Sequence, residues 1–324
     1  MELKKPKPQR TPRNILIAVD ASRQSFEAVR YVGRILPAEG VGVTLCHVPN
    51  TTPDGFWNNN SIPCLQTRFA GSHASQAQQR QWVKEFMEQA RDLLVGLGHP
   101  EDNLSVLVEE QELGITRDIT KRAQGACDAL VVGRKGMSDV QELILGNIAQ
   151  KLLIHPSQAN VWVIGGQPDP AKIIIAMDSS EGARRSIEYV GEVFGETHPD
   201  LLLLHVTGGV KLTLSGQEKA TQGADWLKQA KKEFKRAEKV MATVFEDAVG
   251  RLVQRGADVR RIRTKIVPGV YSCAVAIIGE ALEQGAGTIV MGRRGLSRVE
   301  DFSMGRVSNK VVQLARDMAV WVVH

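Results

Sequence analysis

The same loop of glycines occurs twice in this chain of 324 residues, once in each half. Three glycines recur with identical spacing, in chain order Gly133, Gly136 and Gly146, then Gly292, Gly295 and Gly305. Each set begins where an apolar run ends and closes just before a helical pattern opens. Such a loop presents main-chain N–H groups at a helix N-terminus, where proteins commonly bind phosphate. The repeated loop therefore predicts two phosphate-binding sites.

The glycine loop is part of a duplication that covers nearly the whole chain. The segment RNILIAVDAS in the first half matches AKIIIAMDSS in the second, and NVWVIG matches AVWVVH. An internal repeat of this length predicts two similar domains, each large enough to bury its own core. We expect a basic flexible arm over residues 1–13, one domain over 14–166 and a second over 171–324, joined by a short turn-rich segment.

Within each half, apolar runs alternate with helical patterns. In the first half we expect strands at 15–20, 41–47, 104–108, 129–133 and 161–164, and helices at 25–36, 78–97, 116–124 and 147–154. Continuous apolar strands separated by helices indicate a parallel sheet covered on both faces. The predicted fold class is α/β, with two tandem doubly wound domains, each a five-stranded parallel sheet flanked by helices in a Rossmann-like arrangement. Such sheets bind ligands beyond the carboxyl ends of their strands.

Polar residues lie at these strand ends in both halves. Asp20 and Asp178 follow the first strand of each half, and His47 and His205 end the second. An aspartate at this junction either borders a ligand or caps the following helix. The histidines have no second His or Cys at ligand spacing, which favours packed or solvent-facing side chains over a metal site.

One further pattern distinguishes the second half. Apolar residues from Leu227 to Ala248 advance by threes and fours, which predicts a long helix. This helix either covers the sheet or presents a coiled-coil-like surface to a partner.

Composition excludes several classes of protein. With 43% hydrophobic and 24% charged residues, the chain is an ordinary globular protein rather than a disordered one. The net charge of +5 invites nucleic-acid binding, but aromatics are only 5% and no nucleic-acid-binding signature appears, so this partner is disfavoured. No signal peptide or membrane-spanning segment is found, so we expect a cytoplasmic location and no membrane association. The four cysteines show no CxxC spacing, which indicates neither disulfides nor zinc.

The glycine triplets, the IAVDAS and IAMDSS segments and the duplication together resemble a tandem member of the universal stress protein family. The motif of that family is G-x2-G-x9-G followed by Ser or Thr. The resemblance covers both halves and implies the adenine nucleotide alpha hydrolase-like fold. It also implies binding of ATP or a related adenine nucleotide, with Mg²⁺ as a candidate companion of the phosphates.

In nucleotide-binding members of that family, the glycines hold the phosphates and ribose, while the early Asp and the end of the second strand border the nucleoside. The resemblance, with the charged and hydroxyl residues beside the glycines, gives these candidate cofactor-binding residues: Asp20, Val48, Gly133, Arg134, Gly136, Gly146, Asn147, Asp178, Val206, Gly292, Arg293, Gly295, Gly305, Arg306 and Ser308. No residue is assigned a catalytic or metal-binding role.

This chain departs from the family pattern at two positions. Asn147 and Arg306 stand where nucleotide-binding relatives have a small hydroxyl residue. Asn is a short donor that can substitute for the hydroxyl. Arg306 can either pair with phosphate oxygens or fill the pocket with its own bulk, and Ser308 offers a hydroxyl two residues later. The arginines that follow Gly133 and Gly292 either face the phosphates or belong to a solvated loop.

Two functional hypotheses follow. The chain has no Walker lysine motif, nucleophile elbow or acid/base pair facing the phosphates, so efficient catalysis is not expected. Slow ATP hydrolysis or autophosphorylation rests on the resemblance alone. The first hypothesis is a nucleotide-responsive stress-response switch read by an unknown protein partner. The alternative is a nucleotide-free interaction scaffold with degenerate sites.

The resemblance also bears on assembly. In this family the last strand of a domain commonly pairs with another domain, so Trp162 and Trp321 are expected to pack an interface between the two halves. Such intramolecular pairing makes a monomer sufficient, while the long helix leaves room for a homodimer.

Overall fold

The computed structural model describes residues 13–49, 76–135, 145–154, 159–194, 199–207, 222–268, 272–296 and 304–324. Residues 1–12 of the expected flexible arm lie outside these ranges. Arg13, also assigned to that arm, is instead the first residue of strand β1. Gly136 of the first glycine loop also lies outside the described residues.

The two halves repeat the same order of strands and helices. The elements of the first half are β1 (Arg13–Ala18), α1 (Arg23–Ile35), β2 (Val41–His47), α3 (Gln76–Gly96), a 3₁₀ turn (Glu101–Asn103), β3 (Leu104–Val108), α4 (Ile115–Ala123), β4 (Ala129–Gly133), α5 (Asn147–Ile154) and β5 (Asn160–Ile164). Those of the second half are β6 (Lys172–Ala176), α6 (Glu181–Phe194), β7 (Asp200–Thr207), α7 (Gln222–Gln254), a 3₁₀ turn (Val259–Arg261), β8 (Ile262–Pro268), α8 (Cys273–Gln284), β9 (Thr288–Gly292), α9 (Arg306–Leu314) and β10 (Ala319–Val323).

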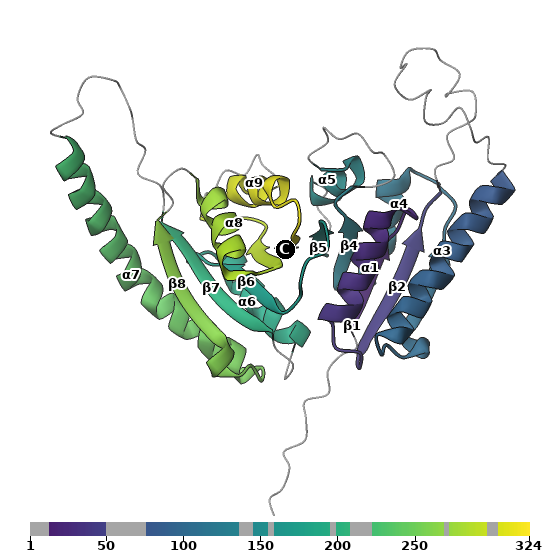
Figure 1. Ribbon diagram of the computed structural model, residues 1–324, viewed down its shortest axis with the longest axis horizontal. Helices are drawn as coiled ribbons and strands as arrows, with labels where there is room; N and C mark the ends of the chain where they lie inside the picture. Colours follow the sequence, from purple (N-terminus) through teal and green to yellow (C-terminus); the bar gives the residue numbers. More distant parts are fainter. Residues whose placement is uncertain are drawn as a thin grey trace, which may run out of the picture.

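The described residues form one ten-stranded sheet, in the order β3-β2-β1-β4-β5-β10-β9-β6-β7-β8. Figure 1 shows β1, β2, β4 and β5 on one side of the molecule and β6, β7 and β8 on the other. Pairing within each half is parallel, which confirms the predicted five-stranded parallel sheets. The two sheets meet through antiparallel pairing of β5 with β10. In each half the strand order reverses between the first strand and the fourth, β1 and β4 or β6 and β9, and this point is where a ligand is expected.

Helices cover the sheet on both faces. Side chains of α1, α3, α6 and α7 share one hydrophobic core with one face of the strands, and those of α4, α5, α8 and α9 share a second core on the other face. Strand β4 shows the alternation, since Val131 faces the first core while Leu130 and Val132 face the second. Each core runs through both halves of the chain.

The seam between the halves is built from aromatic residues. Trp162 of β5 lies opposite Trp321 of β10, and their fully buried rings stack with centroids 3.7 Å apart. Tyr189 of α6 meets both rings edge-on, and the Tyr31 hydroxyl lies 2.7 Å from that of Thr288. The expectation that the two tryptophans pack an interface is confirmed.

Among the described side chains of the two long helices, only those of the later turns are buried against the rest of the protein. In α7 the buried side chains begin at Met241 and continue to Leu252, against α6, β7 and β8, so this part covers the sheet as one of the two alternatives proposed. The side chains of 222–231 lie outside those described. In α3 the buried side chains begin at Phe86, whose ring meets that of Phe26 in α1, whereas Trp82 is 48% exposed.

Candidate functional site

The turn after the first strand of each half is held by an aspartate. Asp20 Oδ1 accepts a hydrogen bond from the Ser22 N–H at 3.1 Å, and Asp178 Oδ1 accepts one from the Ser180 N–H at 2.9 Å. The helix cap is the serine in both halves, since Ser22 Oγ accepts the N–H of Ser25 and Ser180 Oγ accepts the N–H of Ala183. The two aspartates are therefore not helix caps. They fix the turn and keep their carboxylates half-buried at the strand ends.

In the second half, the glycine loop lies against this aspartate. A methyl group added to Gly295 would lie 2.8 Å from Asp178 Oδ2. A methyl group on Gly305 would lie 3.7 Å from the Gly295 nitrogen. The structure thus brings Asp178, Gly295 and Gly305 together at the N-terminus of α9, next to the reversal of strand order. In the first half, Asp20 and Gly146 occupy the equivalent positions in the repeat, and Gly136 is not described.

The first glycine of each loop has a packing role. A methyl group on Gly292 would lie 2.6 Å from the carbonyl carbon of Gly182, and one on Gly133 would lie 3.2 Å from that of Gln24. These distances show that the start of α6 or α1 packs directly on the strand end. The absence of a side chain at these two positions serves helix–strand contact.

The main-chain N–H groups that can face a ligand belong to the first turn of α5 or α9, and not to the last glycine of each loop. The Gly146 N–H donates to the Arg134 carbonyl at 2.8 Å, and the Gly305 N–H donates to the Arg293 carbonyl at 2.9 Å. The first hydrogen bonds within the helices run from the Gln150 N–H to the Gly146 carbonyl and from the Asn309 N–H to the Gly305 carbonyl, both at 2.9 Å. The N–H groups of residues 147–149 and 306–308 therefore have no acceptor within their helices. They lie at the positive, N-terminal end of each helix dipole, where an anion is favoured.

The two loop arginines point away from this site. The Arg134 guanidinium donates to the carbonyls of Gln313 and, at 3.0 Å, Ala315, which end α9 of the other half. The Arg293 guanidinium donates to the Ile154 carbonyl at 3.2 Å, at the end of α5. Both residues are buried, and this burial lowers the pKa of Arg134 to about 10. The sequence-based expectation of phosphate-facing or solvated guanidinium groups is corrected at both positions.

The residues that replace the family hydroxyl are accessible, whereas the hydroxyl nearby is not. Asn147 and Arg306 are exposed at the first positions of α5 and α9, so Arg306 does not fill a pocket. The Ser308 hydroxyl is 4% exposed and donates to the Gly292 carbonyl at 2.8 Å. The expectation that Ser308 offers its hydroxyl to a ligand is therefore corrected, because the hydroxyl already donates its proton to the carbonyl at the end of β9.

The end of the second strand supplies an apolar border. Val48 is buried and Val206 is half-buried. His47 and His205 make equivalent bonds through Nδ1, at 2.8 Å to the Val19 carbonyl and 2.7 Å to the Met177 carbonyl. A carbonyl only accepts, so Nδ1 carries the proton in both rings. His47 is a buried, packed side chain, whereas His205 is half-buried.

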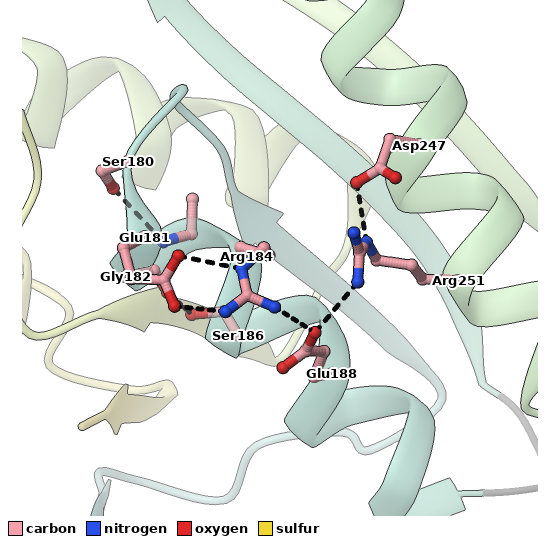
Figure 2. A network of polar contacts seen from close by, with 9 residues as sticks. Ser180, Glu181, Gly182, Arg184, Ser186, Glu188, Asp247 and Arg251 are labelled. Carbon is pink, nitrogen blue, oxygen red and sulfur yellow. Dashed lines mark hydrogen bonds and ion pairs between the residues drawn. The ribbon is translucent and has the colours of Figure 1, made fainter.

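A cleft of about 280 Å³ opens beside Asp178 between α6 and α7. Met177, Ile187, Val244 and Ala248 give it an apolar wall. Its rim is a network of charges shown in Figure 2: Arg184 pairs with Glu181 and Glu188, and Arg251 pairs with Asp247 and Glu188. Because both guanidinium groups are engaged by carboxylates, this rim does not offer unpaired positive charge to a phosphate. Its apolar wall suits a flat, uncharged group.

A second cleft lies in the first half and has a different character. It measures about 490 Å³ and is bounded by the start of α4, by Gln111 and Leu113, and by Ile148 and Lys151 of α5. Arg117 and Lys151 make its lining basic. This cleft adjoins the first turn of α5, next to Asn147.

In the described part of the chain, no helix is both long and apolar enough to cross a membrane. No group of three or more His, Cys, Asp or Glu side chains in that part is arranged to hold a metal ion.

Comparisons with known proteins agree with the duplicated architecture. A sequence profile described as "Universal stress protein family" matches residues 11–165 and again residues 171–324. A universal stress protein of Mycolicibacterium smegmatis is 24% identical over 205 residues, which cover 60% of this chain and 64%, less than two thirds, of that protein. Universal stress protein YxiE of Bacillus subtilis is 26% identical over 145 residues, covering 44% of this chain and 93% of that protein.

A solved structure matches over nearly the whole length. The crystal structure of a universal stress protein from Archaeoglobus fulgidus covers 96% of this chain and 98% of its own, with a TM-score of 0.58 at 19% identity. At this identity the likeness is one of fold.

Proposed function

This chain belongs to the universal stress protein family, and on that premise we propose that it is an adenine-nucleotide-binding regulator of the stress response. ATP or a related adenine nucleotide binds at the strand ends of at least one half. Binding orders the glycine loops and changes a surface that a partner protein reads. Mg²⁺ enters this proposal only as a companion of the phosphates.

The observation that carries the proposal is the meeting of three groups in the second half. Asp178, Gly295 and Gly305 converge at the N-terminus of α9, where a methyl group on Gly295 would already touch Asp178 Oδ2. The N–H groups of 306–308 supply donors and the positive end of a helix dipole for phosphate. The exposed Arg306 guanidinium at the same helix end adds a cation that can pair with phosphate oxygens.

The nucleoside has a separate place in this proposal. An adenine ring is flat and largely apolar, which matches the wall of Met177, Ile187 and Val244 in the cleft beside Asp178. The Asp178 carboxylate lies between this cleft and the glycine loop, where it can accept hydrogen bonds from ribose hydroxyls. In the first half, Asp20 takes the role of Asp178 beside the ribose and Val48 borders the nucleoside. Asn147 lies at the helix end that faces the phosphates.

A nucleotide-free scaffold is the second candidate, and a specific observation favours it. The N–H of Gly146, the N–H of Gly305 and the hydroxyl of Ser308 all donate to carbonyls of the protein itself. These groups are thus satisfied without a ligand. If a site binds phosphate through such donors, its affinity for phosphate is lower when the donors already bond carbonyls of the protein.

The test begins with the protein as purified. It is denatured, and the small molecules released are identified by mass spectrometry; thermal unfolding is then measured with and without added ATP. The proposal predicts an adenine nucleotide in the released fraction or a clear rise in melting temperature with ATP. At one hundred times its Kd, a ligand stabilises the native state by about 2.7 kcal/mol.

The control is a pair of substitutions at the last glycine of each loop. Gly146→Leu and Gly305→Leu place a bulky side chain at the start of α5 and α9, and together they should abolish the rise in melting temperature. A rise that survives both would locate the nucleotide elsewhere. No released nucleotide and no rise in the unmodified protein would establish the scaffold instead.

A further inference from the structure

Each helix that begins at a glycine loop has, at its C-terminal end, carbonyls that accept hydrogen bonds from an arginine of the other half. Helix α9 begins after Gly305, and its last carbonyls, Gln313 and Ala315, accept bonds from Arg134 of the first half. Helix α5 begins after Gly146, and its last carbonyl, Ile154, accepts a bond from Arg293 of the second half. The arrangement is reciprocal, as expected for an interface that relates two copies of one repeat.

The same arginines are built into the glycine loops through their main chain. The Arg134 N–H donates to the Ile164 carbonyl at 2.7 Å, and its carbonyl accepts the Gly146 N–H at 2.8 Å. In the second half, the Arg293 N–H donates to the Val323 carbonyl at 2.7 Å, and its carbonyl accepts the Gly305 N–H at 2.9 Å. One residue therefore ties the start of the phosphate-binding helix in its own half to the end of the equivalent helix in the other.

The helices are short enough for these end contacts to matter. Helix α5 has eight residues and α9 has nine, below the length at which a helix is stable alone in water. A cation at a helix C-terminus satisfies carbonyls that have no intrahelical partner and interacts favourably with the dipole. Both guanidinium groups are buried, with Arg134 3% exposed and Arg293 8% exposed, so water screens these contacts poorly.

We propose that Arg134 and Arg293 are positioning residues that couple the two glycine-loop sites across the seam. Arg134 holds α9 in the position that presents its N-terminal amides to a ligand of the second half, and Arg293 does the same for α5 and the first half. A ligand that stabilises one loop also stabilises the position of the arginine in that loop, and thereby favours binding in the other half. This inference rests on the proposed function, because it describes how the same two sites regulate one another.

A second seam arginine provides a matched control. Arg13 of β1 also crosses between the halves, where its guanidinium lies 2.6 Å from Glu192 and above the Tyr189 ring. Glu192 and Tyr189 both lie on α6, and neither belongs to α5 or α9. Arg13→Met therefore removes a cross-seam arginine without touching a phosphate-binding helix.

The experiment measures ATP binding by isothermal titration calorimetry in full-length chains that keep one site. Gly146→Leu blocks the first site and Gly305→Leu blocks the second. Adding Arg134→Met to the Gly146→Leu chain should weaken ATP binding at the second site by at least about five-fold, the lower end of typical coupling between sites. Adding Arg293→Met to the Gly305→Leu chain should do the same at the first site. Arg134→Lys, which keeps the charge but not the planar fork, should recover part of the affinity.

Hydrogen exchange in the ligand-free protein is the second readout. The amides of α9 from Asn309 to Ala315 should exchange faster in Arg134→Met than in the unmodified chain, and should be unchanged in Arg13→Met. Those of α5 should respond to Arg293→Met in the same way. This measurement needs no nucleotide and reports on each variant even where binding is lost.

The outcomes are distinguishable. Weakened binding and faster exchange in the arginine variants, but not in Arg13→Met, support the inference. If Arg13→Met weakens binding equally, or Arg134→Met leaves both the second site and α9 unchanged, the inference is wrong. If the unmodified chain binds no ATP, the proposed function fails, and unchanged exchange in α9 would then overturn the positioning role as well.

Discussion

At the scale of single residues, glycines that belong to one motif serve different purposes. Gly292 lets α6 pack on the end of β9, whereas Gly295 leaves room beside Asp178. The sequence predicted the spacing and the loop, and the resemblance to the family assigned all these glycines to the phosphates and ribose. It could not separate packing from binding, because that distinction depends on Gly182, which is far away in the chain and approaches only in the folded state.

The packing role of Gly292 gives a direct prediction. Gly292→Ala should lower the free energy of unfolding by about 1–3 kcal/mol, because its methyl group would lie 2.6 Å from the Gly182 carbonyl carbon. Gly279→Ala in α8 is the matched control, since no atom lies within 4 Å of the added methyl group. That change should stabilise the protein by roughly 0.5–1 kcal/mol. Urea unfolding measures both, and equal effects at the two positions would contradict the account.

At the scale of elements, the hydrophobic periodicity of the sequence predicted most of the helices and strands. Strands β2, β3 and β4 and helix α5 have the bounds expected from the sequence, and the other elements of the first half differ by a few residues at their ends. The direction of the Arg134 side chain could not be predicted. Its partners Gln313 and Ala315 lie in the other half, and a charged residue in a glycine loop gives no local sign that it will be buried.

Helix α4 shows how one side chain fixes an element beside the candidate site. The Asp118 carboxylate accepts the N–H groups of Glu112, Leu113 and Gly114 at 3.0–3.3 Å, which orders the segment that lines the basic cleft. Asp118→Ala should cost about 2–3 kcal/mol of unfolding free energy, because these N–H groups lose their acceptor.

The control for Asp118 is an exposed aspartate. Asp92→Ala in α3 should change the free energy of unfolding by no more than about 0.5 kcal/mol. Denaturant unfolding of both variants makes the comparison. A cost for Asp118→Ala as small as that for Asp92→Ala would show that the segment before α4 is held by other contacts.

At the scale of the whole molecule, the two halves form one sheet rather than two separate bodies. In Figure 1 they spread as a V from a centre near the C-terminus, where β5 and β10 pair. The stacked tryptophans fill this centre, and both hydrophobic cores pass through it. The two candidate sites therefore sit in one continuous structure, which is the condition for any coupling between them.

The seam predicts a large effect for a buried tryptophan. Trp162→Ala should lower the free energy of unfolding by about 3–5 kcal/mol, since it leaves a cavity against Trp321. The matched change Trp82→Ala removes a tryptophan that is 48% exposed and should cost far less. Thermal unfolding followed by circular dichroism compares them. Similar costs would mean that the stacked pair contributes little to holding the halves together.

The central claim is that an adenine nucleotide binds at the strand ends where Asp178, or its counterpart Asp20, meets the glycine loop. A crystal structure of the chain grown with ATP tests this most directly. The account predicts density for phosphates at the N-terminus of α9 or α5, with the ribose beside the aspartate. Nucleotide bound at a different place, or both loops closed and empty at saturating ATP, would contradict it.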